Sequence, residues 1–167
     1  NFASQPVISV RDVSGNPVSN FVGRVEVGVS SSGSNVAVLT GTVFRELSAS
    51  PTATFTDLKL NGAVGNYTLT FTSTTAGISS ATSAMALTPG AVDNLELVVQ
   101  ANSANATVIS DVVVRVRDAN NNVITGNTSS IVLTVSNATI SGNATRSAVA
   151  GEATFPGLAI VGTTGSK

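Results

Sequence analysis

The sequence contains no cysteine and no histidine, and only 4% of its residues are aromatic. This inventory excludes disulfides, thiolate chemistry, imidazole general bases and the usual zinc sites. Charged residues make up 10% of the chain, with a net charge of −1. Because a basic face supplies most of the affinity for nucleic acid, we predict that the protein does not bind nucleic acid.

Long apolar runs are also missing. No stretch approaches the roughly 18 consecutive apolar residues that a membrane helix needs, so we predict no membrane insertion. The first residues, Asn1 to Ser4, do not show the basic-then-apolar pattern of a secretion signal. If the protein is exported, we expect its signal to lie outside this sequence.

Apolar residues nevertheless make up 42% of the chain, and valine, alanine, leucine and isoleucine supply most of them. Branched side chains suit strands better than helices. Residues 7–12 (VISVRD) and 24–29 (RVEVGV) alternate between apolar and polar positions, and turn residues follow the first of these runs. Short alternating runs between turns, without helical periodicity, predict an all-β fold of antiparallel sandwiches.

The chain carries one strand pattern twice. Residues 53–60 (ATFTDLKL), expected to form one strand, recur as 153–160 (ATFPGLAI). We predict a first domain at 1–89, a short linker at 90–92 and a second domain at 93–167. We also align Asn1-Phe2 with Asn94-Leu95 at the start of each copy. The second copy ends before the counterpart of Tyr67 to Phe71, so it is expected to lack its last strands.

The inward positions of the first copy define its expected core. A second core would come from their counterparts, such as Phe155 and Leu158. The expected core residues of the first copy are Ile8, Val10, Val25, Val27, Val29, Leu39, Phe55, Leu58, Tyr67, Leu69 and Phe71.

Three segments carry a family resemblance: ISVRDVSGN at 8–16, ATFTDLKLNGAVGNYTLTF at 53–71 and DNLEL at 93–97. Together they resemble the bacterial immunoglobulin-like repeats of large cell-surface adhesins, invasin-like stalks and cell-envelope proteins. The resemblance implies two tandem immunoglobulin-like β-sandwich domains, an extracellular or cell-surface location, and no shared active site. Tyr67 resembles the corner tyrosine of such sandwiches, whose hydroxyl bonds upstream backbone.

The expected function is a non-enzymatic spacer of an exported bacterial adhesin or repeat protein, with neighbouring repeats of the same long chain as its partners. An excerpt of a longer repeat array would explain the unfinished second copy. The alternative is a subunit of a filament or surface layer, assembled by strand exchange with a strand-donating partner chain. A third hypothesis is an ancillary module of an exported glycan-active enzyme.

Four aspartates, Asp12, Asp93, Asp111 and Asp118, could contribute oxygens to a Ca²⁺ site, but calcium needs six or more. No calcium-binding loop motif occurs, so Asp12 and Asp118 are expected to cap turns, and no metal or other cofactor is predicted. Lys59 could in principle form an isopeptide crosslink. It falls on the outward phase of its strand and is expected to be solvated.

Serine and threonine have no histidine partner and the acidic residues are scattered, so we predict no enzymatic activity. Phe21 and Phe44 flank loops and are the only aromatic residues that we would place at a binding surface, although packing is the expected role. Sequons for N-glycosylation occur at Asn66, Asn105, Asn127, Asn137 and Asn143.

Overall fold

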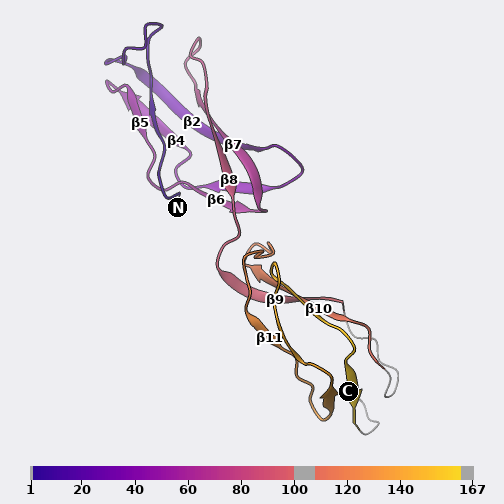
Figure 1. Ribbon diagram of the computed structural model, residues 1–167. Helices are drawn as coiled ribbons and strands as arrows, with labels where there is room; N and C mark the ends of the chain where they lie inside the picture. Colours follow the sequence, from indigo (N-terminus) through magenta and orange to yellow (C-terminus); the bar gives the residue numbers. More distant parts are fainter. Residues whose placement is uncertain (1, 100–107, 163–167) are drawn as a thin grey trace. The chain divides into compact units, whose positions relative to one another are not determined.

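The computed structural model describes residues 2–99 and 108–162 of the chain (Figure 1). Every regular element among these residues is a β-strand, and the strand pairs are antiparallel. The prediction of an all-β fold with antiparallel sheets is therefore confirmed. In the described part of the chain, no helix is long and apolar enough to cross a membrane.

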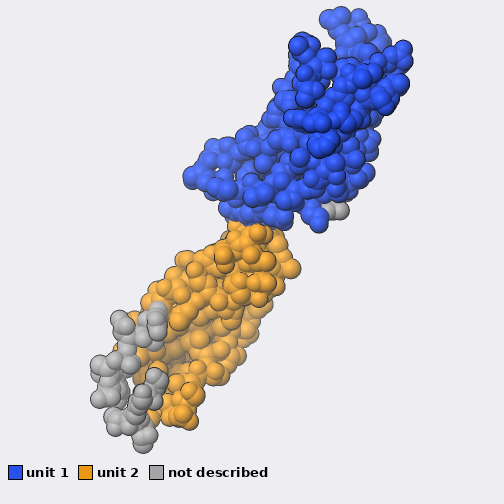
Figure 2. Space-filling model, turned by 180° about the vertical axis from the view of Figure 1, so that it is seen from behind, with its two compact units in different colours: residues 1–88 blue, residues 89–167 orange. Residues whose placement is uncertain are grey.

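The chain divides into two compact units, residues 1–88 and 89–167, which Figure 2 colours blue and orange. The predicted linker, 90–92, belongs to unit 2. Gly90 donates its amide to the carboxylate of Asp118 at 2.8 Å, and Val92 is already the first residue of a strand.

Unit 1 is built on a four-stranded sheet in the order β4-β2-β7-β8, with the pairs β1–β5 and β3–β6 beside it (Figure 1). Its strands are β1 (Val7–Ser9), β2 (Val22–Ser31), β3 (Ala37–Thr40), β4 (Phe44–Ser48), β5 (Thr52–Thr54), β6 (Lys59–Gly62), β7 (Gly65–Ser73) and β8 (Ala81–Leu87).

Side chains from the four-stranded sheet and from the β1–β5 pair form one core in unit 1. The rings of Phe55 and Phe71 meet there with 5.7 Å between their centroids. The expected core residues are buried, except for Ile8, Val29 and Leu39, which are half-buried and pack against the core. Leu47 and Ala53 are buried members that were not predicted.

Unit 2 has fewer strands per sheet. A three-stranded sheet in the order β14-β10-β9 lies beside the pairs β11–β13 and β12–β15. Its strands are β9 (Val92–Val99), β10 (Val112–Asp118), β11 (Ser130–Val132), β12 (Thr139–Ser141), β13 (Thr145–Ser147), β14 (Glu152–Phe155) and β15 (Ala159–Val161).

The pairings of unit 2 match several pairings of unit 1. Phe55 and Phe155 are both fully buried, and so is Leu58, while Leu158 is 1% exposed. The matching opposite pairs are Ile8 with Ala53 and Val114 with Ala153, then Leu39 with Leu60 and Ile140 with Ile160.

The predicted alignment of Asn1-Phe2 with Asn94-Leu95 is wrong. The Phe2 amide donates to the Leu58 carbonyl at 3.1 Å, whereas the amide that donates to the Leu158 carbonyl is that of Ile109, at 2.8 Å. Phe2 therefore corresponds to Ile109. Strand β9, which carries Asn94 and Leu95, has no counterpart in the described part of unit 1.

The predicted single strand over 53–60 is also wrong, although Phe55 does point inward. Strand β5 pairs with β1, whereas β6, a few residues later, pairs with β3. Between the two strands, the carboxylate of Asp57 accepts the Thr42 amide at 3.0 Å and the Thr42 hydroxyl at 2.8 Å. These side-chain bonds hold the segment between β5 and β6 in place of backbone pairing. The two strands therefore do not form one continuous strand.

Candidate functional site

The turn that follows β10 holds a buried carboxylate, Asp118, which is 2% exposed. One of its oxygens, Oδ1, accepts the amides of Asn120 and Asn122, both at 2.9 Å. The other, Oδ2, accepts the Asn122 side-chain amide at 3.0 Å and the Gly90 amide at 2.8 Å. Both oxygens are therefore satisfied by fixed N–H donors, which is what a buried carboxylate requires.

The matching turn after β1 is built from Asp12 in the same way but stays exposed. Asp12 Oδ1 accepts the Ser14 amide at 2.9 Å and the Asn16 amide at 2.8 Å. These bonds, from Asn16 first, hold the pKa of Asp12 below its ordinary value. Both aspartates cap turns, as the sequence predicts.

The calcium hypothesis finds no cluster among the described residues. Asp12 belongs to unit 1, while Asp93, Asp111 and Asp118 belong to unit 2. Asp93 is exposed and accepts the Asn94 side-chain amide at 2.9 Å, and Asp111 is exposed just before β10. No group of three or more acidic residues in the described ranges is placed to hold a metal ion.

The stability of unit 2 is expected to depend on pH through Asp118. Burial opposes its charge, but the hydrogen bonds from Gly90, Asn122 and Asn120 outweigh burial and lower the pKa of Asp118 to about 2 from 3.8. A lowered folded-state pKa stabilises the fold above the unfolded-state value. That stabilisation, about 2 kcal/mol, is lost as the pH falls from 3.8 toward 2.

Urea denaturation followed by circular dichroism at pH 6, 4 and 2.5 measures this dependence. The Asp118→Asn variant, which cannot ionise at this position, is expected to lose less stability over the same range. An equal acid-induced loss in both proteins would assign the effect to other carboxylates.

Lys59 and the two exposed-aromatic candidates lie in ordinary surroundings. Lys59 is exposed on β6, as predicted. Phe21 is half-buried against the core of unit 1. Phe44 is 41% exposed, and the Arg24 guanidinium lies 4.2 Å from the centre of its ring. Packing against a core and against a cation accounts for both phenylalanines.

Four of the five sequons lie within the described residues, and Asn105 lies outside them. Asn66, Asn137 and Asn143 are exposed, whereas Asn127 is half-buried. Two of these side chains already cap local backbone: Asn127 accepts the Ser129 amide at 2.9 Å, and Asn143 accepts the Thr145 amide at 3.1 Å. Asn66 and Asn137 are the sequons whose side chains are both exposed and without such a cap in the described structure.

Tyr67 carries the hydrogen bond that its corner position predicts. Its hydroxyl donates to the carbonyl oxygen of Ala63 at 2.6 Å, and the residue is 2% exposed. The bond ties the start of β7 to the turn before it. Because the chain contains one tyrosine and no tryptophan, Tyr67 is also a fluorescent reporter of unit 1 alone.

An open apolar cavity of about 250 Å³ in unit 2 offers a binding surface by its shape. In unit 1, β7 covers this side by pairing Phe71 with Val27 and Leu69 with Val29. The unit 2 counterparts of Val27 and Val29 are Leu133 and Val135. Both line the cavity, together with Leu97, Ile140 and Ile160.

The fold and these sites define a two-unit all-β protein with antiparallel sheets, carboxylate-capped turns and one open apolar side. Comparison with protein-family models, with characterised proteins and with solved structures finds no match for the chain.

Proposed function

We propose that the chain is a pair of immunoglobulin-like β-sandwich repeats that acts as a non-enzymatic spacer in an exported bacterial adhesin or repeat protein. The single observation that carries the proposal is the correspondence between the two units. Phe55 and Phe155 are fully buried at corresponding positions. The strands that lead to them, β5 and β14, pair with the corresponding strands β1 and β10. The location on the cell surface rests on the resemblance of the sequence to bacterial adhesin repeats.

The connection between the units supports a mechanical role. Strand β8 ends at Leu87 and β9 begins at Val92. Gly90, between them, is fixed to the buried Asp118 of unit 2. A connection this short, with one residue bonded to a folded unit, restricts the freedom of the joint compared with a flexible linker. Units in series would then hold a distal domain away from its anchor.

Small-angle X-ray scattering on proteins with one, two and three copies of residues 1–167 in series tests the spacer function. The maximum dimension is expected to rise by a similar increment with each copy. A matched control inserts a Gly/Ser-rich segment of roughly 12 residues after Thr88, which should broaden the distance distribution. A maximum dimension that does not grow with copy number would contradict the proposal.

The open cavity of unit 2 favours one alternative function, a subunit that assembles by strand exchange. A strand from another molecule would cover Leu133, Ile140 and Ile160 as β7 covers the matching side of unit 1. Under this alternative, sedimentation velocity shows polymers whose size rises with concentration. Adding a copy of residues 63–88 after Gly162 would fill the gap and abolish them. A spacer is expected to remain monomeric with or without the added segment.

A further inference from the structure

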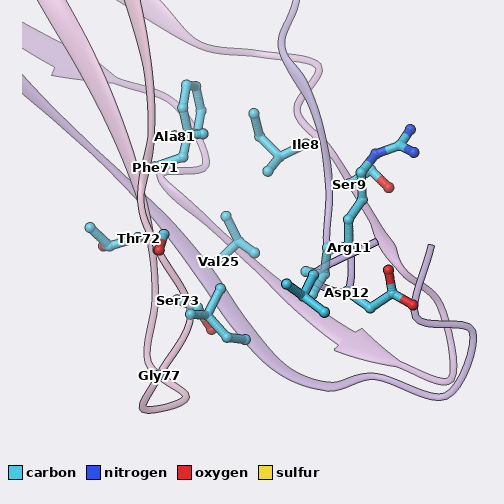
Figure 3. A pocket seen from close by; sticks show the side chains of 14 residues that line it. Ile8, Ser9, Arg11, Asp12, Val25, Phe71, Thr72, Ser73, Gly77 and Ala81 are labelled. Carbon is cyan, nitrogen blue, oxygen red and sulfur yellow. The ribbon is translucent and has the colours of Figure 1, made fainter. Parts of the chain in front are cut away.

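A groove of about 560 Å³ in unit 1 runs along the edge of β1 that faces away from β5. Figure 3 shows Ile8, Arg11 and Asp12 of the β1 segment on one side of it and Phe71 and Ala81 of the β7–β8 hairpin on the other. In the described structure, β1 pairs with β5 alone. The groove therefore has an unpaired strand edge as one wall and, as the other, a mixed surface to which Phe71, Ile78 and Ala81 contribute apolar side chains.

Unit 2 shows what such an edge accepts. Strand β10, the counterpart of β1, pairs with β14 on one side and with β9 on the other. Three contacts fix β9 there. Its backbone pairs along β10, Glu96 forms an ion pair with Arg117, and the Gly90 amide before it donates to Asp118 at 2.8 Å.

The counterparts of these acceptors in unit 1 lie along the groove. Arg11 donates to the Gly15 carbonyl as Arg117 does to that of Asn121, but Arg11 forms no ion pair within the described residues of unit 1. Asp12 corresponds to Asp118, yet it is exposed where Asp118 is buried. Unit 1 thus presents an unpaired backbone edge, a guanidinium and a carboxylate along the groove. They correspond to the three groups of unit 2 that bind β9 and the residue before it.

The apolar faces of the two units are complementary. Leu95 and Leu97 of β9 are 58% and 53% exposed, and the described part of unit 2 has no hairpin like β7–β8 for them to pack on. Unit 1 has that hairpin, and its Phe71, Ile78 and Ala81 line the groove. A strand with leucines at these alternate positions would bury them there, with the intervening carboxylate on the side of Arg11.

We propose that this groove is a docking site for an extended strand with the chemistry of β9, supplied by the segment that leads from a neighbouring unit of the same kind into unit 1. The occupant has a glycine amide for Asp12, two apolar residues separated by one acidic residue, and an antiparallel course along β1. The inference rests on the proposed series of units, since β9 itself is the strand that leads from unit 1 into unit 2.

Hydrogen exchange followed by NMR tests the site on a protein in which a copy of residues 89–108 replaces Asn1 ahead of Phe2. Because the Val10 amide donates to Pro51 on the β5 side, the amides of Ser9 and Arg11 point to the open edge. Their exchange is expected to become about 100-fold slower, while the Val10 amide, already bonded, changes less. Unchanged exchange at Ser9 and Arg11 would overturn the proposal.

Two further proteins separate sequence-specific docking from a general effect of added chain. A copy that carries Asp in place of Leu95 and Leu97 should give no protection, and equal protection would contradict the proposed apolar contacts. A free peptide of residues 89–99 added to the unmodified chain tests delivery by a separate molecule. Protection by the peptide but not by the attached copy would overturn the assignment to a neighbouring unit. Hydrogen exchange at β1 tests the groove and does not depend on whether the units form an extended series. A failure of the docking proposal can therefore be distinguished from a failure of the spacer function, which the scattering experiment tests.

Discussion

Replacing Phe55 by Ala is expected to destabilise unit 1 by about 4 kcal/mol. The side chain is fully buried and its ring packs 5.7 Å from that of Phe71, so truncation removes its contacts and leaves a cavity. The loss approaches the whole stability of a small domain, which is of the order of 5–15 kcal/mol. Urea denaturation followed by Tyr67 fluorescence reports this loss in unit 1 without a contribution from unit 2.

Two variants serve as controls for the Phe55 experiment. Phe44→Ala removes an exposed ring that contacts Arg24, and it should cost about 1 kcal/mol or less. Phe155→Ala empties the matching place in unit 2, so it should reduce the circular dichroism signal of folded unit 2 and leave the Tyr67 transition in place. A shift of the Tyr67 transition in the Phe155 variant would show that the units do not unfold independently.

Replacing Asp118 by Ala is expected to destabilise unit 2 by about 3 kcal/mol. The substitution leaves the amides of Gly90, Asn120 and Asn122 without their acceptor at a place that is 2% exposed. It also releases Gly90, so the segment that leads into β9 loses its attachment. Urea denaturation followed by far-ultraviolet circular dichroism measures the loss.

Asp12→Ala is the matched control for Asp118, because the same turn in unit 1 is exposed and no described residue donates to Asp12 as Gly90 does to Asp118. A clearly smaller effect on the Tyr67 transition is expected. Equal losses of stability in the two variants would mean that the hydrogen bonds within the turn determine the contribution of Asp118. The burial of Asp118 under the segment around Gly90 would then add nothing.

Alternation along the sequence predicted most of the side chains that face the core of unit 1, but it missed Leu47 and Ala53. Val25, Val27, Leu69 and Phe71 are buried because inward positions recur at every second residue of a strand. The hydroxyl bond of Tyr67 was expected from its resemblance to a corner tyrosine, and its acceptor lies only four residues away. These features are local, and a local pattern contains them.

The parts that the sequence did not predict depend on distant segments. The predicted strand over 53–60 is interrupted because Thr42 and Gln5 form hydrogen bonds with the segment between β5 and β6. The alternation of apolar and polar residues does not indicate either contact. Asp12 and Asp118 have the same local sequence role, but only Asp118 is buried, because Gly90 covers it. Phe2 was misaligned for the same reason: strand β9 lies against β10, and the sequence alone does not say which strand a segment joins.

The central position of β7 has a consequence for the order in which unit 1 can fold as the polypeptide is synthesised from its N-terminal end. Strand β2 pairs with β4 on one side, but Val25 to Ser31 must wait for residues 67–73 before the other side is satisfied. Pairing between distant segments is slow, because loop closure precedes any gain from the contacts. In a nascent chain, one side of β2 therefore stays unpaired until β7 has emerged, whereas β9 can pair as soon as β10 has been synthesised.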